Sequence, residues 1–170
     1  MKDTGKDFIR LTHYEHLTPS DQSQGVPAPV LELPYCGGGP LMHLGKPVQP
    51  KSENALMENT LTGRRSIRRF SHAPLSIEEL SWLLWCTQGV QQVIPPSTIR
   101  TVPSAGARHP LDTYVLVNRV KGLNAGLYRY VALEHAIGQL RLDAKIGPLL
   151  QEACLGQYMW VSAAVSCFCV

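Results

Sequence analysis

The stretch Thr62-Gly63-Arg64-Arg65-Ser66-Ile67-Arg68-Arg69-Phe70-Ser71 places four arginines around one serine. Gly63 favours the end of a helix, because glycine readily adopts the left-handed conformation that terminates helices. Arginine presents a planar fork of donors that matches phosphate oxygens, and a serine hydroxyl can complete such a cradle. The stretch therefore predicts a turn that binds a dianion where a helix ends.

A short helix is predicted just before this turn. Ser52 can cap it, and it runs through Thr62 with Met57 and Leu61 four residues apart on one face. After the turn, Phe70 is expected to be buried as the chain enters the next element.

The segment 76–89 carries a strong helix signal. Ser76 and Glu79 have the spacing of a capping box, in which each side chain bonds the backbone of the other residue. Gly89 marks the end of the helix. For Trp82 and Trp85, core packing is preferred over stacking on the ring of a bound ligand. The apolar stripe of this helix is expected to consist of Ile77, Leu80, Leu83 and Leu84.

A third motif is Pro103-Ser104-Ala105-Gly106, whose small or rigid residues let the backbone approach a flat ring closely. The chain thus contains R-R-S-x-R-x-F at 64–70, P-L-S-x-E-E-L at 74–80 and P-S-A-G at 103–106, in that order. This ordered set resembles the nitroreductase-like flavoproteins, and most closely their SagB-type (thiazole/oxazole-forming) dehydrogenase branch. The resemblance extends from about Thr4 to the last residue.

The resemblance implies an α+β sandwich in which helices flank a central, mostly antiparallel sheet. It also implies FMN as the cofactor. By resemblance, Arg64, Ser66 and Arg68 hold the phosphate and polyol of FMN, and Arg65 lies close to the same site.

The resemblance places the flavin ring against the P-S-A-G turn. In the family, this turn meets a flavin that is held mainly by the other subunit, so a homodimer is expected. Gln157 aligns with a family position whose side-chain amide contacts the polar edge of the ring, where an amide can both donate and accept. The further ring-binding residues implied are Pro103, Ser104, Ala105 and Gly106.

Other elements follow from apolar runs and breaker residues. Residues 91–101 contain Pro95-Pro96 and are expected to form a loop. Asp143 is expected to cap a helix that stops at Gly156. Strands are predicted at 113–117, 127–131, 136–142 and 161–170.

The N-terminal residues 1–51 hold seven of the thirteen prolines and the triplet Gly37-Gly38-Gly39, so regular structure is not expected there. An extended arm laid against a surface of its own or of a partner subunit is predicted at 1–51, and a nitroreductase-like domain at 52–170. A mobile tail is the alternative for the arm.

Composition favours one domain that binds a specific small anion. A chain of 170 residues with 44% hydrophobic and 17% charged residues can bury a core and is not of the disordered class. The net charge of +3 indicates no nucleic-acid partner, and aromatic residues are not interleaved with a long basic run. The basic residues are concentrated locally, although a solvated basic turn at 64–69 is the simpler alternative.

Cysteine usage and the termini indicate a cytoplasmic protein. Five cysteines without a C-x-x-C pair suit reduced thiols better than disulfides or a metal site. Cys167 and Cys169 share one face of a strand and are expected to be buried, and His109 has no partner at ligand spacing. Neither a signal peptide nor an apolar run of membrane-spanning length is seen.

The resemblance implies an FMN-dependent oxidoreductase that transfers hydride between a nicotinamide donor, NAD(P)H, and a small acceptor such as a nitro or quinone compound. The SagB-type alternative is a dehydrogenase that oxidises azoline rings in modified peptides. The alternative from another class is an inactive remnant or a flavin- or anion-binding module, because family members continue past the position of Val170 and the chain looks truncated. No catalytic acid, base or nucleophile is assigned, since the chemistry belongs to the cofactor.

Overall fold

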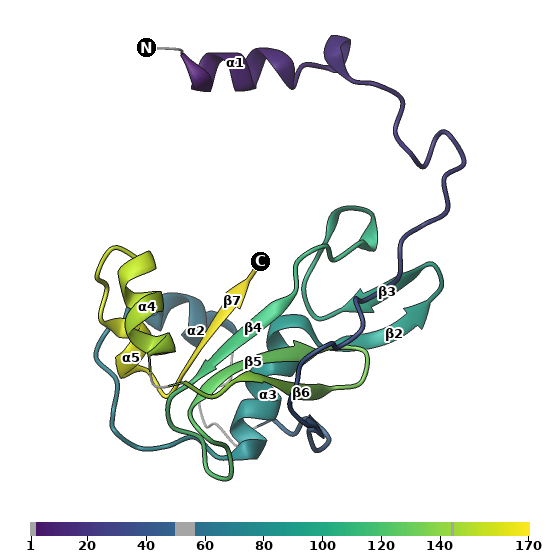
Figure 1. The fold of residues 1–170 in the computed structure, drawn as a ribbon. Coiled ribbons are helices and arrows are strands. Elements are labelled where there is room, and N and C mark those ends of the chain that lie inside the picture. The colour runs from purple at the N-terminus through teal and green to yellow at the C-terminus, as the bar shows by residue number, and fades with distance from the viewer. Residues whose placement is uncertain (1–2, 50–56, 144) are drawn as a thin grey trace. The chain divides into compact units, whose positions relative to one another are not determined.

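The computed structural model describes residues 3–49, 57–143 and 145–170. Contacts within the chain divide it into two units, residues 1–30 and 31–170, which are described separately (Figure 1). The arm predicted at 1–51 therefore includes the whole first unit and the beginning of the second. The domain boundary after residue 51 stays a prediction.

The first unit contains helix α1 (Thr4–Leu11) and a short 3-10 turn at Tyr14–His16. An ion pair between Arg10 and Asp7, at 3.2 Å, joins successive turns of α1, and this spacing supports helices. The expectation of no regular structure was wrong here, because the prolines that suggested it begin only at Pro19.

The second unit is built on a five-stranded sheet with the order β1-β6-β5-β4-β7 (Figure 1). All four neighbouring pairs are antiparallel, which confirms an α+β class with a central antiparallel sheet. The expected strands at 113–117, 127–131 and 136–142 are confirmed to within one residue at each end. The strands are β1 (Leu41–His43), β4 (Thr113–Val117), β5 (Gly126–Val131), β6 (Ala136–Arg141) and β7 (Val165–Cys169).

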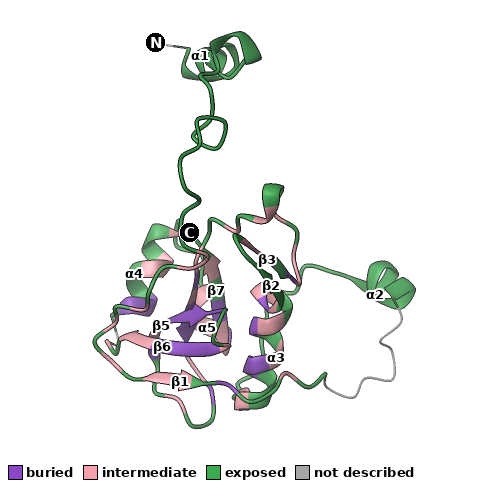
Figure 2. Ribbon diagram, turned by 90° about the vertical axis from the view of Figure 1, so that its right-hand side faces the viewer, coloured by how far each residue is buried: buried purple, intermediate pink, exposed green. Residues whose placement is uncertain are grey.

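Helix α3 (Ile77–Gln88) packs on this sheet and completes the core (Figure 2). The predicted capping box is confirmed: Ser76 Oγ accepts a hydrogen bond from Glu79 N at 3.2 Å, and Glu79 Oε2 accepts one from Ser76 N at 2.7 Å. Leu80 and Leu84 are fully buried. They pack against the sheet residues Val115, Val117, Tyr128, Tyr130 and Ile137.

Residues 31–40, here called the strap, are fixed to the sheet by charged side chains. The carboxylate of Glu32 accepts hydrogen bonds from Ala132 N at 2.8 Å and from Leu133 N at 2.9 Å, in the turn between β5 and β6. Arg129 on β5 donates to two strap carbonyls, at 2.8 and 3.0 Å. The strap then continues into β1, which pairs with β6 at the edge of the sheet.

Residues 90–100 form a hairpin and not the loop expected at 91–101. Strands β2 (Val90–Ile94) and β3 (Ser97–Arg100) pair antiparallel, and Pro95-Pro96 connects them. Valine, isoleucine and threonine favour strands. The two prolines, which suggested a loop, lie only in the turn, where no ladder hydrogen bond is needed.

The C-terminal part contains one more helix than expected. Helix α4 (Ile146–Ala153) is followed by the short α5 (Met159–Ser162), so the strand predicted from 161 begins only at Val165. An apolar run fits a buried strand and a buried helix equally well, which explains the error. Asp143 precedes α4 but does not cap it: its Oδ1 accepts from Lys145 N at 2.9 Å, and Lys145 is the N-cap residue.

Helix α2 (Met57–Gly63) precedes the arginines as predicted. Ser52, its expected cap, lies outside the described residues. Among the helices that the structure describes, none is long and apolar enough to cross a membrane.

Several hydrophobic side chains are less buried than expected. Phe70 and Leu83 each remain 44% exposed, so the expectation that they join the core was wrong. Trp82 and Trp85 are half-buried, and their rings stack with centroids 5.4 Å apart.

Candidate functional site

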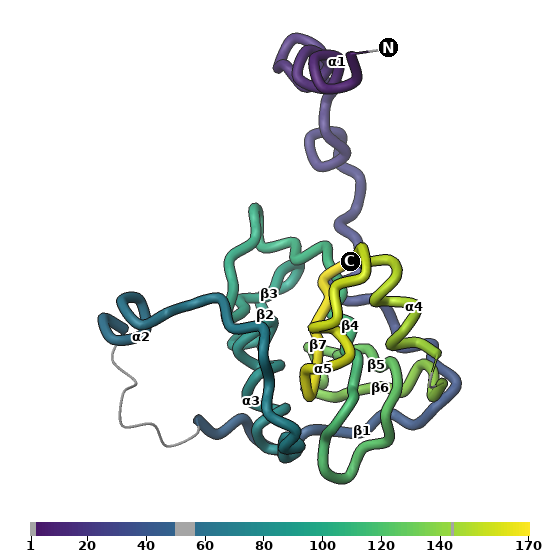
Figure 3. The backbone as a smooth tube through the Cα atoms, turned by 90° about the vertical axis from the view of Figure 1, so that its left-hand side faces the viewer, coloured from purple at the N-terminus to yellow at the C-terminus, as the bar shows by residue number. Residues whose placement is uncertain are grey.

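Residues 64–71, here called the arginine segment, lead from α2 back to α3 (Figure 3). The side chains of Arg64, Arg65, Ser66 and Arg68 are all exposed. Arg65 is committed to the helix end, because its Nη1 donates to the carbonyls of Thr62 at 3.1 Å and Arg64 at 2.8 Å. In the part of the chain that the structure describes, no acceptor is bonded to the side chains of the other three.

The far end of the arginine segment is tied to the α5 region. The hydroxyl of Tyr158, which precedes α5, donates to the carbonyl of Arg68 at 3.3 Å. Arg119 Nη2 donates to the carbonyls of Ser71 at 3.2 Å and Ser162 at 2.7 Å. The structure therefore brings the arginine segment next to Tyr158, the chain neighbour of the predicted ring-binding residue Gln157. Neither Tyr158 nor Arg119 was identified from the sequence, because no local motif marks them.

The P-S-A-G turn is held in one conformation by its own hydrogen bonds. Ser104 Oγ accepts from His109 N at 2.9 Å, and the Ser104 carbonyl accepts from Ala107 N at 3.0 Å. Gly106 has a φ of 64°, a value that side chains disfavour, which accounts for glycine at this position. Pro103, Ala105 and Gly106 are exposed, so the backbone of the turn is open to a ligand.

A hollow of about 380 Å³ lies between β3 and this turn. Its walls include Thr98 and Arg100 of β3 together with Ser104 and His109. The pKa of His109 is lowered, first by burial and then by the neighbouring Arg100 cation. The hollow was not predicted from the sequence, because residues 91–101 were expected to form a loop. The available signal was the spacing of Thr98 and Arg100, which are two residues apart and so share one face of a strand.

Over the residues that it describes, the structure shows no polar link between the two halves of the predicted site. No hydrogen bond or ion pair between described residues joins the arginine segment to the P-S-A-G turn. The resemblance predicts that such halves meet across a subunit interface, and this stays a prediction.

Comparison with known proteins identifies the family. Residues 61–168 match the sequence model of the Nitroreductase family, a span that includes both the arginine segment and the P-S-A-G turn. This chain belongs to the nitroreductase family. Members of this family are in general flavin-dependent oxidoreductases, and FMN is their usual flavin.

Three relatives illustrate the match. A protein of Methanocaldococcus jannaschii named as a candidate nitroreductase is 38% identical over 115 residues, which cover 68% of this chain and 56% of that protein. Trifolitoxin-processing protein TfxB of Rhizobium leguminosarum bv. trifolii is 38% identical over 55 residues, 32% of this chain and 15% of that protein. A crystal structure of a candidate nitroreductase from Anabaena variabilis has a TM-score of 0.61 at 27% identity and covers 77% of this chain and 27% of that chain. This nitroreductase-family chain thus spans about half the length of the first relative and less of the other two.

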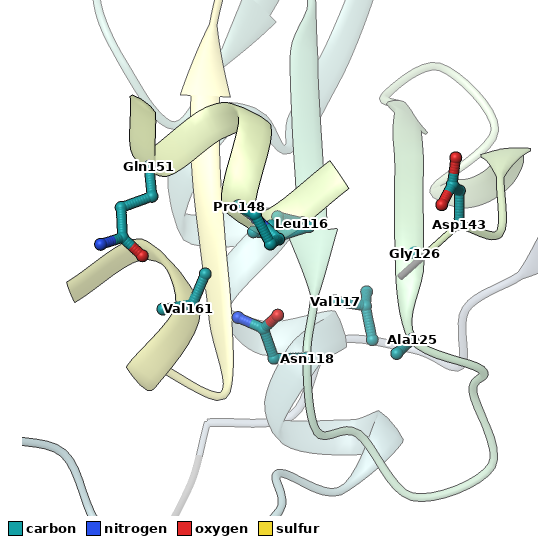
Figure 4. Close-up of a pocket in the computed structure, with 10 residues that line it drawn as sticks. Leu116, Val117, Asn118, Ala125, Gly126, Asp143, Pro148, Gln151 and Val161 are labelled. Atoms are coloured by element: carbon teal, nitrogen blue, oxygen red, sulfur yellow. The ribbon is translucent and has the colours of Figure 1, made fainter. Parts of the chain in front are cut away.

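A second hollow, of about 300 Å³, lies beside α4 and the end of β4 (Figure 4). Its polar side chains are largely engaged within the chain: Asn118 Nδ2 donates to the carbonyls of Trp160 at 2.9 Å and Ala163 at 3.0 Å. The carboxylate of Asp143 is bonded to Arg141 and to a backbone N–H. None of the predicted cofactor residues of this nitroreductase-family chain lines the hollow.

The described residues of this nitroreductase-family chain contain no group of three metal-ligating side chains. All five cysteines are free. Cys167 and Cys169 lie exposed on β7, so the expected burial of these side chains was wrong. Their strand lies at the edge of the sheet, where one side has no neighbouring strand within the described chain.

Proposed function

We propose that this nitroreductase-family chain is part of an FMN-dependent oxidoreductase that transfers hydride between a nicotinamide donor, NAD(P)H, and a small acceptor such as a nitro or quinone compound. The observation that carries the proposal is the family match, which spans both the exposed arginine segment and the P-S-A-G turn. Because the chain spans only part of its relatives, the activity is proposed for the complete protein.

The arginine segment fits the phosphate end of FMN. Arg64, Ser66 and Arg68 are exposed and carry donors that no described residue engages. Guanidinium groups bind phosphate oxygens in pairs, so two arginines and a hydroxyl can hold a dianion. Arg65 would contribute its positive charge nearby, while its guanidinium stays bonded to the carbonyls at the end of α2.

The P-S-A-G turn fits the flat ring of FMN. Pro103, Ala105 and Gly106 present small or rigid groups at the surface, and Ser104 fixes the shape of the turn by its bond to His109 N. Bound FMN would supply the hydride-transfer chemistry. The protein would hold and orient the ring and exclude water from one of its faces.

Gln157 is proposed to meet the polar edge of the ring. It is exposed and directly precedes Tyr158, which is bonded to the arginine segment. Its side-chain amide can bond a polar ring atom as donor or acceptor. A homodimer in the cytoplasm completes the proposal, with the P-S-A-G turn of one subunit against the flavin held by the other.

A second candidate function is the oxidation of azoline rings in modified peptides. It is favoured by the similarity of 55 residues to a protein named for trifolitoxin processing. Turnover of a thiazoline-containing peptide, without reduction of nitro or quinone acceptors by NADH or NADPH, would favour this function. A protein that binds flavin but turns over neither class of substrate would be the non-catalytic binding module.

Flavin binding by matched variants tests the proposal. Arg64→Ala should raise the Kd for FMN about 10- to 100-fold, because a charge-assisted bond of about 1.5–3 kcal/mol is lost. Arg69→Ala is the control, since Arg69 is an exposed arginine of the same segment at a position the motif leaves open. Flavin fluorescence quenching measures both affinities, and chromatography after heating identifies the flavin.

The wild-type protein should be yellow and should release FMN. Equal Kd values for Arg64→Ala and Arg69→Ala would contradict the assignment of the phosphate site. A complete protein that stays colourless in excess FMN would contradict the function as a whole.

A further inference from the structure

Arg100 is a buried cation at the end of β3. Arg100 is only 9% exposed and lies on the same face of β3 as Thr98, which is 2% exposed, with the exposed Ile99 between them. The guanidinium donates to two neutral acceptors, Thr98 Oγ1 at 3.2 Å and Gln88 Oε1 at 3.4 Å. Among the described residues, no carboxylate lies within ion-pair distance of it. Burying a charge is costly unless an opposite charge compensates it.

Arg129, the other buried arginine of the second unit, shows how a buried positive charge is compensated in this chain. Arg129 is 6% exposed, forms an ion pair with Asp112 at 3.1 Å and donates to two carbonyls of the strap. Arg100 has neither kind of partner. The end of α3 nearby offers only a partial negative charge. The Trp85 carbonyl at that end already accepts from Gly89 N at 2.7 Å and Thr101 Oγ1 at 2.8 Å.

The hollow beside Arg100 is open to solvent. Arg100, Thr98, Ser104 and His109 contribute to its walls, and its volume is about 380 Å³. Burial and the Arg100 cation both lower the pKa of His109, so the imidazole is neutral near pH 7 and adds no second positive charge. One positive charge in a small hollow matches a monoanion, and a guanidinium with free donors matches the two oxygens of a carboxylate.

We propose that the hollow between β3 and the P-S-A-G turn binds a small molecule through its carboxylate, and that Arg100 is the residue that holds the carboxylate. Thr98 positions the guanidinium through its bond to Nε. Ser104 and His109 also line the hollow. The binding site itself does not depend on the flavin.

The identity of this molecule rests on the proposed function. A molecule held by Arg100 lies beside the turn that we propose contacts the flavin ring. The carboxylate is therefore assigned to the substrate, so that aromatic or unsaturated acceptors bearing a carboxylate are bound more tightly than neutral ones.

Benzoate is a suitable probe, because it is a small monoanion with a flat ring. The full chain without flavin is titrated with benzoate and, as a neutral analogue, with benzamide, and binding is followed by tryptophan fluorescence and thermal unfolding. Benzoate at ten times its Kd should raise the Tm by roughly 3–6 °C. Benzamide should leave the Tm unchanged.

The response should disappear in Arg100→Met and persist in Arg108→Met, which removes an exposed arginine beside the turn. If Arg100→Met does not fold, Arg100→Lys replaces it in the test. Lysine keeps the positive charge but cannot donate two parallel hydrogen bonds to a carboxylate, so the Kd for benzoate should rise about tenfold.

Three results would overturn the proposal: no response of the wild type to benzoate, an equal response in the Arg100 and Arg108 variants, or an unchanged Kd in Arg100→Lys. Each would assign Arg100 to the support of the hairpin alone. Because flavin is absent from this titration, its outcome is distinguishable from failure of FMN binding, which is read from flavin fluorescence.

Discussion

The strap and the arginine segment are both irregular stretches of the second unit, but their charged side chains differ in whether they are bonded within the chain. Along the strap, Glu32 accepts two backbone hydrogen bonds and Arg129 joins two strap carbonyls and Asp112. Along the arginine segment, Arg64 and Arg68 are exposed and unbonded to described acceptors. Charged side chains that are bonded within the chain stabilise the fold, whereas exposed charged side chains without a partner in the described chain are available to a ligand.

The same contrast extends to the two halves of the candidate site. The P-S-A-G turn is shaped by internal bonds before any ligand binds, while the arginines must lose side-chain freedom on binding. Each immobilised long side chain costs about 0.5–1.5 kcal/mol. In the proposed site, the turn would therefore set the position of the ring, and the arginine segment would supply charge at an entropic cost.

Replacing Arg129 with methionine should give the largest effect. The change leaves the Asp112 carboxylate and two strap carbonyls without their donor, and we expect the free energy of unfolding to fall by roughly 2–4 kcal/mol. Asp112 is partly solvated, which keeps the loss below that of a fully buried pair. Urea denaturation measures it. The control Arg141→Met breaks an exposed pair with Asp143 and should lower the free energy of unfolding by less than about 1 kcal/mol. Equal losses in the two variants would show that the bonds of Arg129 to the strap and Asp112 stabilise the fold no more than an exposed ion pair does.

Glu32→Gln should give the next largest effect. Gln has one acceptor oxygen in place of two, and its amide group would face a backbone N–H donor of the turn between β5 and β6. We expect a loss of about 1–3 kcal/mol in the free energy of unfolding. Glu134→Gln is the control, because Glu134 is an exposed partner of His43 at 3.9 Å. A loss of the same size in both variants would show that the strap is not held by the Glu32 carboxylate.

Gly106→Ala tests the built-in shape of the P-S-A-G turn. A Cβ at this position would meet only Arg108 Cγ at 3.8 Å, so space is not the constraint. The left-handed conformation costs a side chain about 1–2 kcal/mol, and stability should fall by that amount. Gly5→Ala, in α1 with open space around it, should instead stabilise its helix by about 0.5–1 kcal/mol. A neutral Gly106→Ala would mean that the turn is not conformationally fixed.

The sequence predicted the parts of the fold that depend on local pattern. The capping box at Ser76 and the apolar runs of β4, β5 and β6 were recognised, because a cap and a strand each leave a signal within a few residues. The hairpin at 90–100 and the helix α5 were missed. In the first case prolines suggested a loop, and in the second an apolar run fitted two kinds of element.

The candidate site was predictable to the extent that it is carried by contiguous motifs. The arginine segment and the P-S-A-G turn are such motifs, and their roles remain predictions. The residues that support them are distant in sequence: Tyr158 and Arg119 hold the arginine segment through backbone carbonyls, which any residue type presents. Arg100 was missed because its burial depends on the hairpin that packs it against the end of α3.

Tyr158→Phe should give the smallest effect and tests how the loosely held half of the site is ordered. The hydroxyl makes one exposed bond to the Arg68 carbonyl at 3.3 Å. Its loss should therefore change the free energy of unfolding by less than about 0.5 kcal/mol. If this bond helps to place Arg68 for the phosphate, the Kd for FMN should still rise, by about two- to fivefold, because more freedom is lost on binding. Tyr14→Phe, at a tyrosine that is 92% exposed in the first unit, should change neither quantity. An unchanged Kd in Tyr158→Phe would show that the arginine segment reaches its binding conformation without this tether.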